Sequence, residues 1–158
     1  MNEKRFEKSL RKICKEADNP AAMMVRLEKT WRDGFDFNMG KSKIDGEFII
    51  HRTMLRTTVV PLKNAVWAFK NSEEPTEKSV IVSIALDSRL KSYDVRSLSL
   101  APAAADMMLG YIWENCPDIA IGFDEQLNEF YFDENYEELR KHAHTQRKEN
   151  VKYARHVK

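Results

Sequence analysis

The chain has 158 residues, of which 42% are hydrophobic and 32% are charged. This length and apolar content are typical of one globular domain and exclude a chain that is disordered throughout. The net charge is +1, from 26 Lys and Arg against 25 Asp and Glu. Because a nucleic-acid-binding protein usually carries a clear basic excess, we expect no nucleic-acid partner.

The N-terminal segment is predicted to be a helical hairpin. Apolar residues recur with helical spacing over residues 3–17 and again over residues 21–31. Pro20 suits the first turn of the second helix, and Gly34 suits its end. We therefore assign residues 1–34 to a helical hairpin packed on the domain.

Residues 35–145 are predicted to form the main α+β domain. Its strands are short runs rich in β-branched and aromatic residues, and the short polar turns between them favour antiparallel pairing. The runs are Glu47–His51, Arg56–Val60, Ala65–Phe69, Ser79–Leu86 and Lys91–Leu98. We expect Ser79–Leu86 to be central in its sheet and Lys91–Leu98 to lie at an edge.

Helical spacing returns at Pro102, where a broad apolar stripe predicts a helix over Pro102–Asn115. We expect this helix to cover the sheet, and Asp118–Phe123 to be a short, extended connector. The fold class is therefore α+β. We predict an antiparallel, strongly bent sheet of about five or six strands, capped by this helix.

The C-terminal part is predicted to be helical and to end in a basic segment. Asp124 is expected to cap a short helix that ends at Phe130, and Asp133 to cap a longer helix that begins near Glu134. Residues 146–158 form the basic end of that helix or a tail. The acidic first half and basic second half of the long helix match the helix dipole, so this charge pattern requires no partner.

A series of motifs carries a family resemblance: FIIHR, TTVVPLKNAVWAFK, VIVSIAL, the Ala103–Trp113 helix and CPDIAIGFDEQLNEFY. Their order is similar to that of an uncharacterised bacterial domain family of unknown function. It also resembles the strand-then-helix pattern of pleckstrin-homology-like (PH-like) domains. The matching region runs from Met39 to Lys141. The resemblance implies a bent PH-like sheet closed by a helix, and it implies no active site.

Basic residues in or beside the first strand turns are the candidate anion-binding residues: Lys41, Lys43, Arg52 and Arg56. In a PH-like fold, the loops that join the first strands can hold an anion such as a lipid headgroup. This sequence lacks a glycine-rich phosphate cradle, and Asp45 and Glu47 dilute the positive charge. Solvated turn charges are therefore the simpler interpretation.

The tryptophans and histidines are further site candidates. Strand and helix contexts favour core positions for Trp67 and Trp113, whereas Trp31, near a helix end, is a candidate interface residue. His142 and His144 would project about 200° apart on a helix, so they cannot share a metal ion. We predict no metal and no cofactor.

The sequence contains no recognisable catalytic set. No His is placed by a motif to activate Ser79, Ser83 or Cys116. We therefore expect a non-enzymatic binding or scaffolding module that mediates protein–protein interaction or self-association. The alternatives are an anion- or lipid-headgroup-binding module and an enzyme whose site is hidden by sequence spacing.

The expected location is a reducing cytoplasm. Cys14 and Cys116 are the two cysteines and lie far apart, which argues against a disulfide framework. The charged N-terminal segment lacks the apolar core of a signal peptide, and no apolar run is long enough to span a bilayer. We expect no transmembrane segment and disfavour peripheral membrane contact.

Overall fold

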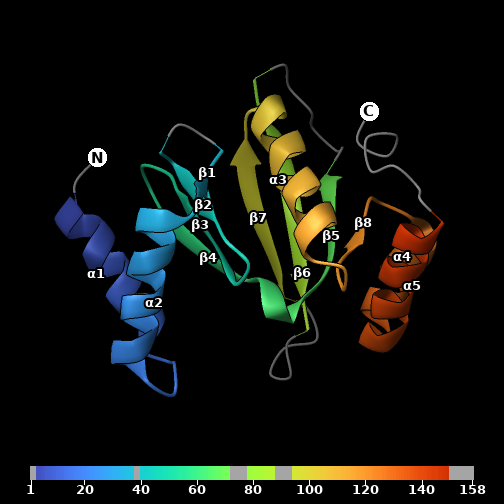
Figure 1. Ribbon diagram of the computed structural model, residues 1–158, viewed down its shortest axis with the longest axis horizontal. Helices are drawn as coiled ribbons and strands as arrows, with labels where there is room; N and C mark the ends of the chain where they lie inside the picture. Colours follow the sequence, from blue (N-terminus) through green and yellow to red (C-terminus); the bar gives the residue numbers. More distant parts are fainter. Residues whose placement is uncertain (1–2, 38–39, 72–77, 88–93, 150–158) are drawn as a thin grey trace. The chain divides into compact units, whose positions relative to one another are not determined.

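The computed structural model describes residues 3–37, 40–71, 78–87 and 94–149. The predicted α+β class is confirmed, because these residues form five α-helices and two four-stranded, mostly antiparallel sheets (Figure 1). The strands are divided between two sheets of four, which differs from the predicted single sheet of about five or six strands. The chain separates into two compact units, Met1–Pro61 and Leu62–Lys158, which we call unit 1 and unit 2.

Unit 1 consists of a helical hairpin and an antiparallel meander. Its elements are α1 (Glu3–Cys14), α2 (Pro20–Asp33), β1 (Phe35–Asp36), β2 (Ser42–Ile44), β3 (Phe48–Arg52) and β4 (Thr57–Pro61). The strands pair antiparallel in the order β1-β2-β3-β4. The predicted hairpin and the strand predictions at Glu47–His51 and Arg56–Val60 are confirmed, with small shifts at the ends.

The second helix begins and ends where its flanking residues predict. The Asn19 side chain caps α2 by accepting a hydrogen bond from the Ala22 N–H at 3.1 Å, and Pro20 occupies the first turn. At the other end, the Gly34 N–H donates to the Thr30 carbonyl oxygen at 2.8 Å. A Cβ atom on Gly34 would lie 2.4 Å from that oxygen, so this close approach requires glycine.

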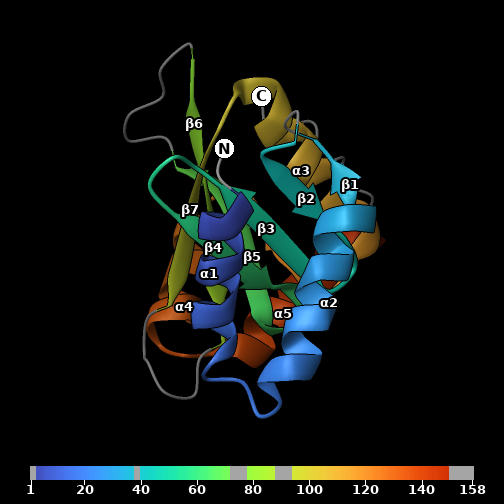
Figure 2. The same cartoon turned by 90° about the vertical axis from the view of Figure 1, so that its left-hand side faces the viewer.

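The helical hairpin of unit 1 packs on its sheet and shares one core with it. Figure 2 shows α1 and α2 side by side, with β4 packed against α1 and β3 against α2. The shared core is formed by Phe6, Leu10, Cys14, Leu27, Phe48, Ile50 and Val59. The predicted boundary at residue 34 therefore falls inside unit 1, because burial of these side chains joins the hairpin to the meander.

Unit 2 begins with a short turn and continues as a second sheet with helices. Its elements are a 3-10 turn (Leu62–Asn64), β5 (Ala65–Asn71), β6 (Val80–Leu86), β7 (Val95–Leu100), α3 (Pro102–Asn115), β8 (Ala120–Ile121), α4 (Glu125–Phe132) and α5 (Tyr136–Lys148). The strand order is β7-β6-β5-β8, and β8 joins parallel to β5. The structure confirms that β6 is internal, that β7 lies at one end of this sheet and that α3 spans its predicted range. Residues 91–93 of the predicted edge strand lie outside the described residues.

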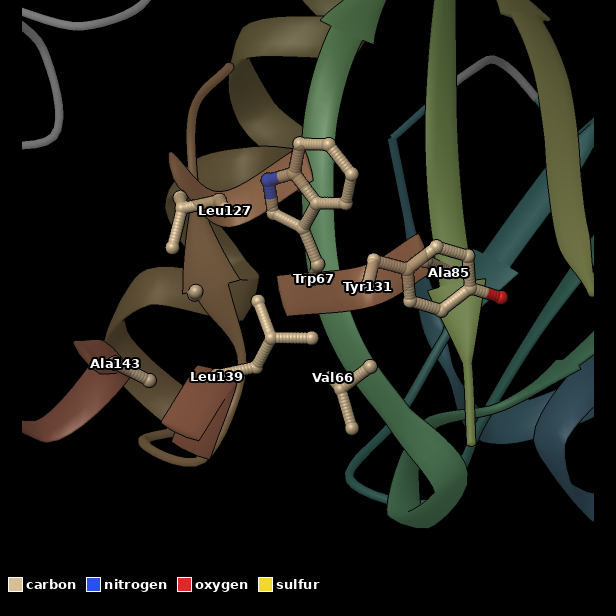
Figure 3. Packing of buried hydrophobic residues seen from close by; sticks show 8 residues of the cluster. Val66, Trp67, Ala85, Leu127, Tyr131, Leu139 and Ala143 are labelled. Atoms are coloured by element: carbon tan, nitrogen blue, oxygen red, sulfur yellow. The ribbon is translucent and has the colours of Figure 1, made fainter. Parts of the chain in front are cut away.

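The core of unit 2 is organised around Trp67, on β5. Trp67 belongs to a buried cluster whose other members include residues of β5, β6, α4 and α5 (Figure 3): Val66, Ala85, Leu127, Tyr131, Leu139 and Ala143. The buried indole Nε1 donates a hydrogen bond to the Gly122 carbonyl oxygen at 2.8 Å, so its polar group is satisfied. The core interpretation of Trp67 is confirmed.

The last helix begins later than predicted, and a different residue caps it. Asp124 caps α4 as predicted, but Asp133 follows the end of α4 and does not cap α5. The side chain of Asn135 caps α5, and Glu134 has a φ of 55°. A left-handed conformation at Glu134 separates the two helices, and a non-glycine residue gives little sequence signal for it. The predicted tail beyond residue 149 lies outside the described residues.

Candidate functional site

The turn between β3 and β4 exposes two large apolar side chains. Met54 is 85% exposed and Leu55 is 90% exposed. The turn closes on itself, since the Thr53 N–H donates to the Arg56 carbonyl oxygen at 2.8 Å and the Arg56 N–H donates to Thr53 Oγ1 at 3.1 Å. Exposed apolar side chains rimmed by polar residues are typical of interaction sites.

A cavity of about 230 Å³ lies beside this turn. We call it the Arg52 pocket, and its lining residues come from α1, the end of β3 and the turn: Arg5, Phe6, Ser9, Arg52, Thr53, Met54, Leu55, Arg56 and Thr57. It is smaller than the roughly 300–1,000 Å³ of pockets that enclose drug-sized ligands. A single side chain or a small anion fits this size better than a large cofactor does.

Arg52 is the polar side chain that the fold buries most deeply in this pocket. It is 4% exposed, and its guanidinium carbon lies 3.7 Å from the ring centre of Phe6 and 4.9 Å from that of Trp31. The two rings are themselves 4.8 Å apart. Cation–π contact with both rings holds the guanidinium plane in place. Trp31, the predicted interface residue, therefore positions Arg52 from within unit 1.

The hydrogen-bonding capacity of Arg52 is incompletely used. Within the described residues, its buried Nε has no hydrogen-bond partner. Its Nη1 lies 3.4 Å from Glu3 Oε1, and this carboxylate belongs to a side chain that is 72% exposed. A long contact to a solvated carboxylate compensates poorly for burial of a charge. The Nε is also closed off from solvent, so an anion in the pocket could accept its hydrogen bond only after the side chains that cover it move aside.

The structure separates the four residues predicted to bind an anion. Arg52 and Arg56 line the pocket. Lys41 lies beside them along the backbone, because its carbonyl oxygen accepts from the Arg52 N–H at 2.8 Å. Lys43 instead forms an ion pair with Asp36, with 3.3 Å between Nζ and Oδ2. Of the predicted anion-binding residues, the two arginines line the pocket, Lys41 is a backbone neighbour of Arg52, and Lys43 is paired with Asp36.

Sequence reasoning missed the contribution of α1 to this site. Arg5, Phe6 and Ser9 line the pocket although they are far from β3 in the sequence. No local pattern indicates that contact, because it depends on how the hairpin packs. The apolar pair Met54 and Leu55 between polar turn residues was a visible signal.

The acidic residues expected to dilute the pocket charge lie at the opposite end of β3. Asp45 Oδ1 accepts from the N–H groups of Glu47 and Phe48 at 2.8 and 2.9 Å. Its Oδ2 accepts from Thr30 Oγ1 at 2.7 Å and lies 3.1 Å from Arg26 Nη2. Burial raises the pKa of Asp45, but these hydrogen bonds and the Arg26 charge outweigh burial, so the pKa is below its usual value.

A second cavity, of about 240 Å³, lies in unit 2. Its lining combines apolar, acidic and amide side chains with one histidine: Ile121, Gly122, Phe123, Asp124, Leu127, His142, Gln146 and Glu149. His144 has a different partner, because its Nε2 lies 2.5 Å from Asp118 Oδ1. In the described ranges, no group of three or more His, Cys, Asp or Glu side chains is placed to hold a metal ion.

Ser83 and Cys116, two of the side chains considered as nucleophiles, are poorly placed to act as such. Ser83 is buried on β6. Burial raises the pKa of the Cys116 thiol and Asp118 raises it further, while Arg147 lowers it, and the net pKa is above the usual value. A thiol of raised pKa is a poor nucleophile near neutral pH. Trp113, predicted as a core residue, is half-buried and lies 4.4 Å from the Arg147 guanidinium.

Comparisons with known proteins give this chain no relatives from which a site could be transferred. No protein-family model matches the sequence, and no curated protein or solved structure is significantly similar to it. Among the described helices, none has the length and apolar character needed to cross a membrane. The geometry of the Arg52 pocket is therefore the feature from which a function can be inferred.

Proposed function

We propose that this chain is a non-enzymatic binding module whose binding surface is the Arg52 pocket with its apolar rim, Met54 and Leu55. The observation that carries the proposal is the buried Arg52 guanidinium, whose Nε has no partner among the described residues. A purely structural arginine would be expected to use its donors within the fold. Arg52 instead lies in a cavity beside exposed apolar side chains.

The partner class that fits this surface best is an acidic segment of another protein that carries an apolar residue. Arginine is typical of the energetically important centres of protein interfaces, and methionine is enriched in interfaces. The apolar rim would bury Met54 and Leu55, and the arginines of the pocket would pair with acidic groups of the partner. A cavity of about 230 Å³ can receive one partner side chain.

The test is affinity capture with the full chain, followed by binding measurements on the purified partner. The double variant Met54→Ser/Leu55→Ser should weaken binding at least tenfold, because truncation of an interface anchor commonly costs more than about 1.4 kcal/mol. Val25→Ser is the control, since Val25 is 66% exposed on α2 and does not line the pocket. Equal binding by the double variant and the control would contradict the proposal.

We also propose the PH-like relationship and the cytoplasmic location. Support for the first comes from unit 2, where antiparallel strands β5, β6 and β7 are followed by α3. The division of the strands between two sheets counts against it. NMR contacts that join the two sheets into one bent sheet closed by α3 would sustain the proposal, and separate sheets in solution would reject it. Cys14 and Cys116 are free thiols, as a reducing compartment favours. Localisation of a fluorescent fusion tests the second proposal.

A further inference from the structure

We infer that the Arg52 pocket binds a doubly charged oxyanion, of the class of a phosphate monoester, carried by the protein partner. The assignment of the anion to a protein partner rests on the proposed function. The assignment of an oxyanion to this pocket follows from the residues that line the pocket and does not depend on the proposed function. Three arginines, Arg5, Arg52 and Arg56, contribute to its lining. Clusters of arginine are the usual means by which proteins recognise phosphorylated segments.

Arg52 supplies the geometry for binding an oxyanion. Its Nε and a neighbouring Nη nitrogen lie on one edge of the guanidinium, and they can donate two parallel hydrogen bonds to two oxygens of one anion once the entering anion displaces the side chains that cover the Nε. The Nε is buried and has no partner within the described residues. Because Phe6 and Trp31 already hold the guanidinium, little side-chain freedom remains to be lost when an anion binds.

The local charge favours a dianion over a single carboxylate. None of the described residues that line the pocket is acidic. The acidic side chain that contacts Arg52 is Glu3, at 3.4 Å and largely exposed, so the incoming anion need only displace a weak contact. A singly charged carboxylate would balance one guanidinium, whereas a phosphate dianion can also interact with Arg5 and Arg56.

The test is an NMR titration that follows the Arg52 Nε–H signal in the full chain with inorganic phosphate, and with acetate for comparison. The signal is assigned by its loss in Arg52→Lys. Phosphate should shift it saturably, and Arg56→Gln should weaken binding about fivefold, the effect of losing roughly 1 kcal/mol of charge-assisted interaction. Arg11→Gln is the matched control, because Arg11 is exposed on α1 and does not line the pocket.

Each outcome of the titration supports or overturns the inference. A saturable phosphate shift that Arg56→Gln weakens and Arg11→Gln leaves unchanged supports it. No saturable shift overturns it, and so does an acetate shift as strong as that of phosphate. A shift produced by phosphatidylserine vesicles but not by a phosphoserine peptide would overturn the assignment to a protein partner. A phosphate shift together with unchanged partner binding by Met54→Ser/Leu55→Ser would sustain the oxyanion pocket and reject the proposed function.

Discussion

The guanidinium of Arg52 lies 3.7 Å from the centre of the Phe6 ring, which places a buried positive charge from the end of β3 against an aromatic residue of α1. This contact brings together two parts of unit 1 that are distant in the sequence. It also keeps the guanidinium in one position beside the cavity. The contact explains how a small unit can present a fixed positive charge without a strong acidic partner within its own fold.

Substitution of Arg52 by methionine separates a binding role from a structural one. Methionine keeps an unbranched apolar stem that can pack beside Phe6 and Trp31, is shorter than arginine, and removes the poorly compensated charge. We expect Arg52→Met either to lower the free energy of unfolding by less than about 1 kcal/mol or to increase it. Arg52→Ala should lower it by about 2–4 kcal/mol, because a cavity forms beside the rings. Urea unfolding measures both, and a large loss in Arg52→Met would indicate a structural role.

Glu3 is expected to compete with the bound anion. Its carboxylate lies 3.4 Å from Arg52 Nη1, so Glu3→Gln removes both a local negative charge and a rival acceptor. The affinity for phosphate should rise about two- to fivefold, in line with the modest energy of an exposed ion pair. Calorimetric titration measures the change. Glu7→Gln, at an exposed position of the same helix, should have a smaller effect, and equal effects would point to long-range charge alone.

Asp45 should make the stability of unit 1 sensitive to acid. Its pKa is lowered in the folded state, so its stabilising contribution is complete above the ordinary value of about 3.9 and is lost as the pH falls through the lowered folded pKa. Asp45→Asn should destabilise the protein by about 1–3 kcal/mol near neutral pH and by less near pH 3. Chemical unfolding across this range checks the trend. Asp18→Asn, in the exposed turn after α1, is the control, and its effect on the free energy of unfolding should be small throughout this pH range.

Gln146 should protect the outer edge of β8 in unit 2. Its side-chain Oε1 accepts from the Ile121 N–H at 3.0 Å, and its Nε2 donates to the Ile121 carbonyl oxygen at 2.8 Å. The amide thus takes the place of a neighbouring strand. Gln146→Ala should lower the free energy of unfolding by about 2–3 kcal/mol, because two buried backbone groups lose their partners. Gln126→Ala, exposed on α4, is the control, and equal stability of the two variants would reject this role.

The helices and strands of this protein were largely predictable because their signals are local. The apolar stripe of Pro102–Asn115 and the proline in the first turn of α2, Pro20, gave boundaries that the structure reproduces closely. Asp133 was wrongly predicted to cap α5, because the left-handed conformation of Glu134 has no clear sequence signal. The division into two sheets was not predictable either, since strand partners are chosen by long-range packing.

The candidate site was only half predictable for the same reason. Arg52 and Arg56 were identified by their position beside a strand turn. Their local context could not show that Phe6 and Trp31 hold Arg52, or that Arg5 lines the same cavity. Lys43 was included in the predicted site because the sequence does not reveal its ion pair with Asp36. That pair depends on the register of β1 and β2. Charges near one another in sequence thus acquire different roles once the strands pair.

The most direct test of the central claim is the dissociation constant of the captured partner for the wild-type chain and for Arg52→Met, both shown to be folded. If the Arg52 pocket is the binding surface, the variant should bind at least tenfold more weakly, because its buried, charge-assisted contacts are lost. The Arg11→Gln control should bind like the wild type. A folded Arg52→Met variant that binds the partner with wild-type affinity would contradict the account.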